Sequence, residues 1–171
     1  MTKKPMTLYA QADEVDGQLE WSIGETPPTK KGQKKTITFP KNSGEYSVTV
    51  QLIDKTQRGI VFNPASPLYV QEGGTCPPAA GINTPEIPAS SVVPTPASLT
   101  FTNRNTKDCS LIYQLNFVDS KNRDVVPALD PEFKNGGGGG RKLTTAAAVT
   151  VAAIGVLLIY LVLTSMGKLG R

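Results

Sequence analysis

The side chains that could carry out chemistry are few in this chain of 171 residues. It contains no histidine and only two cysteines, Cys76 and Cys109. Histidine is the residue most often used for proton transfer near neutral pH and is the commonest metal ligand, so its absence excludes Ser-His-Asp and Cys-His catalysis and histidine-ligated zinc. Two cysteines alone cannot complete a tetrahedral zinc site. We therefore expect no enzyme activity, no catalytic residue, no metal, no cofactor and no small-molecule substrate.

One short stretch concentrates positive charge, since four lysines fall within six residues: Lys30, Lys31, Lys34 and Lys35. Basic side chains gain about 1 kcal/mol each near an anionic membrane surface, which favours contact with an acidic partner or anionic lipid. The alternative is a solvated hairpin loop. We expect no nucleic-acid binding, because residues 1–140 carry 14 basic and 14 acidic side chains and no aromatic residue interleaves with these lysines.

The cysteines and a glycine run each leave a chemical question. Cys76 and Cys109 can form a disulfide in an oxidising compartment and remain free thiols in the cytoplasm, and their spacing leaves both open. The five glycines at 136–140 lack the following Lys-Ser/Thr of a P-loop. We interpret residues 134–142 as a Gly-rich tether with a basic flank, reaching roughly 12 to 20 Å.

The strongest pattern in the chain is the run of 25 uncharged residues from Leu143 to Gly167. As a helix this run is about 37 Å long, and the hydrocarbon core of a bilayer is about 30 Å thick. We predict a transmembrane helix over residues 143–167, followed by a short basic tail at 168–171. The net charge of +4 comes entirely from the residues that bracket the helix: Arg141, Lys142, Lys168 and Arg171.

The predicted helix has one side made of small residues: Thr144, Ala148, Ala152 and Gly155. Small residues at this spacing let a second helix approach closely, so we expect helix packing there. Tyr160 lies about one and a half turns inside the C-terminal end. We interpret it as an interfacial anchor alongside the four bracketing basic residues; the alternative is contact with a neighbouring subunit or cofactor.

The expected topology is single-pass and tail-anchored. The N-terminal residues contain no apolar stretch long enough for a signal peptide, so we expect the N-terminal domain in the cytoplasm and the short C-terminus on the opposite side. The basic residues near the helix agree weakly, with four on its N-terminal side and two beyond it.

The elements that precede the helix are predicted to be strands. Residues 46–53 and 111–118 alternate apolar and polar side chains, as half-buried strands do. Five shorter stretches are further candidates: 19–23, 36–39, 59–62, 68–70 and 99–102. About seven strands predict an all-β soluble domain over residues 1–133 with an immunoglobulin-like sandwich architecture.

Residues 72–98 carry the densest proline and glycine in the domain. We expect this long loop to stay outside the sheets, either lying across a partner or forming a disordered insertion.

This layout indicates a non-catalytic, single-span accessory subunit that packs into and stabilises a larger integral membrane complex. Photosynthetic and respiratory complexes are candidate hosts, and the expected partners are integral membrane subunits and the bilayer. The alternative is a tail-anchored adaptor whose β-sandwich binds a soluble protein or anionic lipid.

Overall fold

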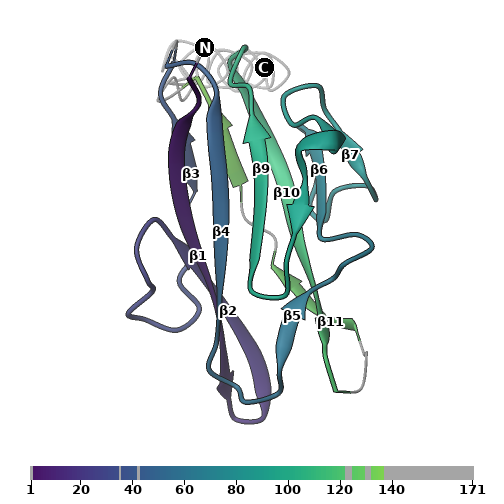
Figure 1. Ribbon diagram of the computed structural model, residues 1–171. Coiled ribbons are helices and arrows are strands. Elements are labelled where there is room, and N and C mark those ends of the chain that lie inside the picture. The colour runs from purple at the N-terminus through teal and green to yellow at the C-terminus, as the bar shows by residue number, and fades with distance from the viewer. Residues whose placement is uncertain (1, 35, 42, 122–124, 130–131, 137–171) are drawn as a thin grey trace, which may run out of the picture. The chain divides into compact units, whose positions relative to one another are not determined.

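The computed structural model describes residues 2–34, 36–41, 43–121, 125–129 and 132–136. These residues form twelve strands and one 3-10 turn, η1 (Ala89–Ser91). The strands are β1 (Lys4–Val15), β2 (Gln18–Gly24), β3 (Ile37–Phe39), β4 (Tyr46–Asp54), β5 (Ile60–Phe62), β6 (Leu68–Glu72), β7 (Ile82–Asn83), β8 (Val93–Pro94), β9 (Ser98–Asn103), β10 (Cys109–Asp119), β11 (Val125–Leu129) and β12 (Glu132–Asn135). The domain is therefore all-β, with two mixed sheets (Figure 1).

The first sheet has the strand order β2-β1-β4-β9-β8. β1 pairs antiparallel with β2 and parallel with β4, with Lys4 opposite Tyr46. The alternation expected for β4 is present, because Val48 and Val50 are buried while Thr49 lies on the other face, next to Thr100 of β9. One face of this sheet therefore supplies half of the core.

The second sheet is organised around β10. The antiparallel partners of β10 are β12 and β11 on one side and β6 and β5 on the other. The outer strand β3 pairs parallel with β12, and β7 pairs parallel with β6. Leu111, Tyr113, Leu115 and Phe117 of β10 are buried, as their period of two requires.

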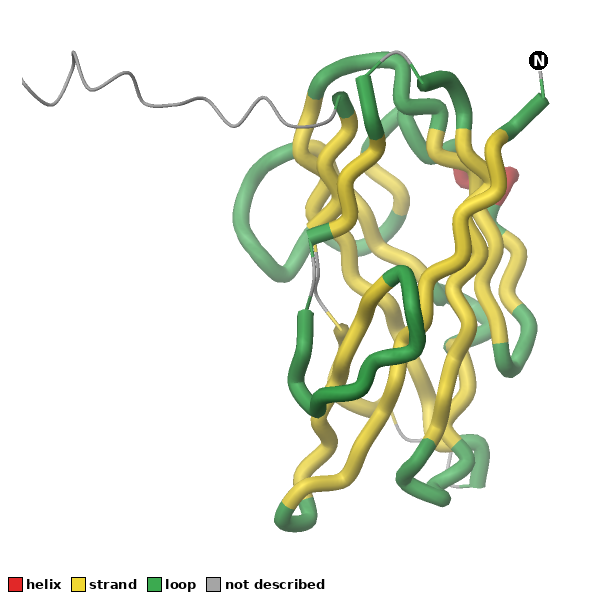
Figure 2. The backbone as a smooth tube through the Cα atoms, turned by 90° about the vertical axis from the view of Figure 1, so that its left-hand side faces the viewer, coloured by secondary structure: helices red, strands yellow, loops and turns green. Residues whose placement is uncertain are grey.

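Aromatic side chains join the inner faces of the two sheets. Trp21 of the first sheet stacks on Phe117 of the second, with ring centroids 4.1 Å apart. At the other end of the core, the ring centroid of Phe101 in the first sheet lies 5.9 Å from that of Phe133 in the second. These contacts place the two sheets face to face in a sandwich-like arrangement, and Figure 2 shows the strands in two layers.

All seven expected strands are present, with ends shifted by at most two residues. The expected count of seven is nevertheless wrong, because β1, β7, β8, β11 and β12 were not anticipated. β1 carries a weak hydrophobic signal: its fully buried apolar residues are Leu8 and the small Ala10 and Ala12, with Met6 partly buried beside them. Its other face buries Gln11 and Asp13, which hydrogen-bond at 2.7 Å. β12 continues to Asn135, so residues 134 and 135 belong to the sheet rather than to the expected tether.

The expectation that residues 72–98 stay outside the sheets is wrong at two places. β7 is an edge strand of the second sheet and β8 is an edge strand of the first. Pro94 is tolerated in β8 because an edge strand leaves one row of backbone groups unpaired. Between β7 and β8 the chain inserts Ile87, which is fully buried, so this segment closes one open side between the sheets.

Within the described ranges, no helix has the length and apolar character needed to cross a membrane. Residues 143–167 lie outside those ranges.

Candidate functional site

The lysine-rich loop joins β2 to β3 and projects from the side of the domain (Figure 1). Its base is held by Ser22, whose hydroxyl donates to the carbonyl of Lys30 at 3.1 Å and accepts from the backbone N–H of Gln33 at 3.2 Å. Lys30, Lys31 and Lys34 are exposed, so the structure brings three of the four expected lysines together on one loop. Lys35 lies outside the described residues.

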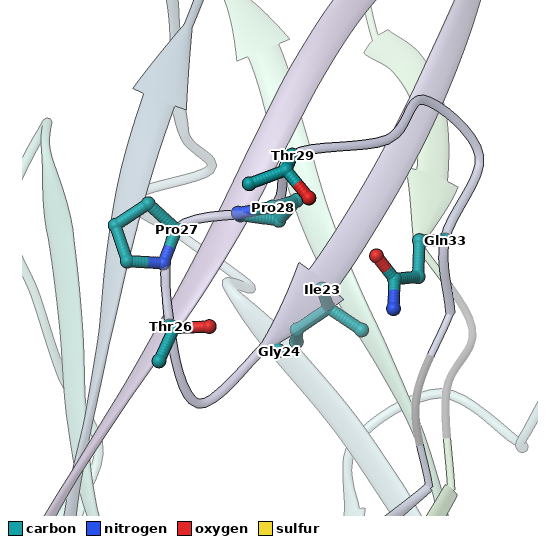
Figure 3. Close-up of a pocket in the computed structure, with 7 residues that line it drawn as sticks. All are labelled: Ile23, Gly24, Thr26, Pro27, Pro28, Thr29 and Gln33. Carbon is teal, nitrogen blue, oxygen red and sulfur yellow. The ribbon is translucent and has the colours of Figure 1, made fainter.

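A small hollow of about 130 Å³ lies at the base of this loop. Figure 3 shows the chain leaving β2 at Gly24, turning through Pro27 and Pro28, and returning with Gln33 on the other side of Ile23. Ligand pockets for small molecules typically measure roughly 300 to 1,000 Å³. This hollow is too small to be such a site.

Two further hollows adjoin residues 72–98, the Pro/Gly-rich segment. The larger measures about 280 Å³ and lies between residues 64–69 and parts of residues 81–94. The smaller measures about 150 Å³ and shares Pro64 and Pro94 with it. Val93 of β8, whose chain neighbours Val92 and Pro94 line the larger hollow, is 58 % exposed. The smaller hollow is lined mainly by apolar atoms and the larger by polar and apolar atoms in similar measure, so the arrangement is a proline-lined surface rather than an enclosed chemical site.

A buried polar network lies where the described chain ends. The amide of Asn135 donates to Glu86 Oε2 at 3.1 Å and to Asn103 Oδ1 at 3.1 Å, and Asn103 donates back to Asn135 at 2.7 Å. The carboxylate of Glu86 also accepts the backbone N–H and the hydroxyl of Thr106. Glu86 is only 1 % exposed. Its carboxylate thus joins the Pro/Gly-rich segment to the ends of β9 and β12.

Gly136 extends this network and is the first of the five glycines. Its backbone N–H donates to Asn105 Oδ1 at 3.2 Å. Its φ is +87°, and a Cβ there would lie 2.7 Å from the carboxyl of Asp108. Gly136 is therefore a packed part of the domain, which no feature of the sequence indicated.

Both cysteines are free thiols. Cys76 is exposed, whereas burial raises the pKa of the half-buried Cys109 thiol to about 11, with Glu72 and Glu86 adding to the rise. The thiolate is the nucleophile and the metal ligand, so Cys109 is an unreactive thiol at neutral pH.

The helix-packing and anchoring residues expected from the sequence lie outside the described residues: Arg141, Lys142, Thr144, Ala148, Ala152, Gly155, Tyr160, Lys168 and Arg171. In the part of the chain that is described, no cluster of three or more His, Cys, Asp or Glu side chains could hold a metal ion. The sequence matches no known family model and no curated protein.

Proposed function

We propose that this protein is a non-catalytic accessory subunit that packs into and stabilises a larger integral membrane complex through a single transmembrane helix over residues 143–167. The observation that carries the proposal is the run of 25 uncharged residues between two pairs of basic side chains. This run begins seven residues after Gly136, the last described residue of the β domain. A helix of that length exceeds the thickness of the hydrocarbon core.

The small-residue side of the proposed helix supports assembly with other membrane helices. In a helix of 3.6 residues per turn, Thr144, Ala152 and Gly155 each fall within about 40° of Ala148, so the four residues span an arc of about 80°. Close helix approach in a membrane depends on such small side chains.

The described domain supports a structural role, because the buried carboxylate of Glu86 is used up in hydrogen bonds that hold the fold together. Glu86 accepts hydrogen bonds from Thr106 and Asn135. We also propose that the domain is an immunoglobulin-like sandwich in its two-layer packing. Its parallel pairs β1–β4, β3–β12 and β6–β7 are an addition to the antiparallel sheets of that architecture.

The helix-packing side can be tested against a matched control. Replacing Ala148, Ala152 and Gly155 by Leu should release the protein from its complex, because bulky side chains keep a neighbouring helix away. Replacing Ala146, Thr150 and Ala153 by Leu introduces the same number of Leu side chains about 140° to 160° around the same helix and should leave the complex intact. Native electrophoresis after mild detergent extraction measures the difference.

Three outcomes contradict parts of the proposal. Release of the wild-type chain by alkaline carbonate shows that it does not span the bilayer. Migration of the wild type as a lone monomer excludes the subunit role. Equal behaviour of the two Leu variants excludes the small-residue side as the contact.

A second candidate function is a membrane-anchored adaptor whose β domain captures a soluble protein. The observation that favours it is the proline-lined surface around Pro64 and Pro94, with the exposed Val93 and the two adjoining hollows. An adaptor would remain anchored in both Leu variants, and substitution of Val93 by Lys would reduce capture of its ligand.

A further inference from the structure

One end of the β domain gathers basic residues that are far apart in the sequence. Lys4 begins β1, and its backbone N–H donates to the carbonyl of Glu45. Lys3 reaches across to Thr102 of β9 at 2.8 Å. Arg104 directly follows β9, and Lys41 follows Pro40, whose carbonyl accepts from Asn105 at 2.9 Å. We call these four exposed residues the exit surface: Lys3, Lys4, Lys41 and Arg104.

The exit surface is where the chain leaves the domain. Gly136 donates to Asn105, the residue after Arg104. Figure 1 places the N-terminal end of β1 and the C-terminal end of β9 at the same end of the molecule. Only four residues lie between Gly136 and Arg141, so even a fully extended chain spans at most about 18 Å between them.

The charge of this end is positive. Glu45 and Asp108 are the exposed or half-exposed carboxylates beside the four cations, while Lys107 is paired with Glu72 and Lys134 with Glu132. The buried carboxylate of Glu86 lies at the same end, where it accepts from Asn135, so the described residues leave an excess of one positive charge close to the point of exit. This excess is not visible in the neutral total of residues 1–140.

The lysine-rich loop lies farther from the exit. Lys34 forms a β-bridge with Ile23, which pairs with Ala10 of β1. Ala10 is six residues along β1 from Lys4, or roughly 20 Å at the rise of a strand. The loop therefore reaches a surface near the exit only when the domain lies on its side.

We propose that the exit surface, and not the lysine-rich loop, binds an anionic lipid surface and orients the domain on the bilayer. The inference rests on the proposed membrane anchor. The short connection keeps the exit surface near the lipid headgroups, where basic side chains are attracted within a Debye length of about 8 Å at physiological salt. The chemistry recognised is the negative charge of headgroups such as phosphatidylserine.

The test uses the full chain with Cys76 and Cys109 replaced by Ser. A fluorescent probe is attached to a new cysteine at Thr2 beside the exit surface or, in a second protein, at Gln18 in the β1–β2 hairpin at the opposite end. Each protein is reconstituted into liposomes of phosphatidylcholine with or without about 30 % phosphatidylserine, containing lipids with a spin-labelled headgroup. Quenching of the probe reports its proximity to the headgroups.

We expect quenching of the Thr2 probe at least about twofold stronger than that of the Gln18 probe in phosphatidylserine liposomes. The part of this difference that is absent from pure phosphatidylcholine liposomes should disappear at about 0.5 M salt. The triple variant Lys4→Gln, Lys41→Gln, Arg104→Gln should lose it as well. The matched variant Lys30→Gln, Lys31→Gln, Lys34→Gln removes the same charge and should retain it.

The proposal is overturned by equal quenching of the two probes, by quenching independent of phosphatidylserine, or by a loss confined to the Lys30/Lys31/Lys34 variant. Alkaline carbonate treatment of the same liposomes distinguishes a failure of the exit-surface proposal from a failure of the proposed membrane anchor. A chain that resists extraction but shows no phosphatidylserine-dependent quenching contradicts only the exit-surface proposal, whereas extraction contradicts the membrane anchor itself.

Discussion

The hydroxyl of Tyr113 is fully buried and has no hydrogen-bond partner among the described residues. Its ring stacks on Phe133 with centroids 3.6 Å apart, and burial raises the pKa of the phenol well above its usual value. A buried polar group without a partner costs about 1 to 3 kcal/mol. The ring of Tyr113 therefore stabilises the core, whereas its unpaired hydroxyl lowers the stability of the fold.

Tyr113→Phe should raise the free energy of unfolding by about 1 kcal/mol, because it removes the unpaired hydroxyl and keeps the ring. Urea unfolding measures the change. Tyr69→Phe, at a half-exposed position, is the control and should change stability by less than about 0.5 kcal/mol. A loss of stability in Tyr113→Phe would show instead that the hydroxyl is satisfied by a buried water.

Asp54 holds the turn between β4 and β5. Its carboxylate accepts from the hydroxyl and N–H of Thr56 and from the N–H groups of Gly59 and Ile60, at 2.6 to 3.0 Å. Burial acts to raise the pKa of Asp54, but these hydrogen bonds outweigh it and the pKa is lowered. A lowered pKa means that the charged form stabilises the fold.

Asp54→Asn should cost about 1 to 2 kcal/mol at pH 7 and less in acid. The carboxylate's contribution is complete above its unfolded pKa of about 4 and is lost as the pH falls through the lower folded value. Urea unfolding at pH 7 and at about pH 3 should therefore show the wild type approaching the variant in acid. A difference that stays constant with pH would contradict the role assigned to the charge.

At the scale of elements, residues 72–98 act as a clasp on one side of the domain. The segment adds β7 to the second sheet and β8 to the first, and it buries Ile87 and Glu86 between them. Its prolines lie in turns and at an edge, where a missing N–H costs little. Because β7 and β8 are only two residues long, the clasp joins the two sheets mainly through the buried side chains of Ile87 and Glu86.

Ile87→Ala should destabilise the domain by about 2 to 4 kcal/mol and open the clasp, because it leaves a cavity between the sheets. Limited proteolysis should then cleave residues 72–98 several times faster than in the wild type. Val93→Ala changes an exposed position in the same segment and is the control. Unchanged cleavage in Ile87→Ala would show that the clasp is held without this side chain.

At the scale of the whole molecule, Phe133 connects the sheets near the exit. It contacts Phe39 and Tyr113 within the second sheet and Phe101 in the first, with ring centroids 3.6 to 5.9 Å apart. Its strand, β12, is also the last element before the chain leaves the domain. This side chain therefore contacts aromatic rings of both sheets.

Phe133→Ala should cost about 3 to 5 kcal/mol and unfold both sheets together. Near-UV and far-UV circular dichroism should give coincident transitions at a lowered denaturant midpoint. Phe133→Leu, which retains much of the apolar volume, should lose distinctly less. Two separated transitions would show that the sheets are stable independently.

The sequence by itself determined the features whose signal is local. Alternation in stretches such as 46–53 and 111–118 indicates strands because side chains of a strand alternate between two faces. The charge-bracketed run at 143–167 predicts a membrane helix for a similarly local reason: its length and apolar character are properties of one segment.

Only the tertiary structure decided which distant segments meet. The pattern of β1 is weak because Ala10 and Ala12 bury little apolar surface, and its parallel pairing with β4 joins residues about forty positions apart. The same holds for the exit surface. Lys3, Lys41 and Arg104 carry no common pattern, and they become one surface because β1, β4 and β9 pair side by side and bring their ends together. A charged cluster within six residues is visible in the sequence, whereas one assembled from three strand ends exists only after the strands have paired.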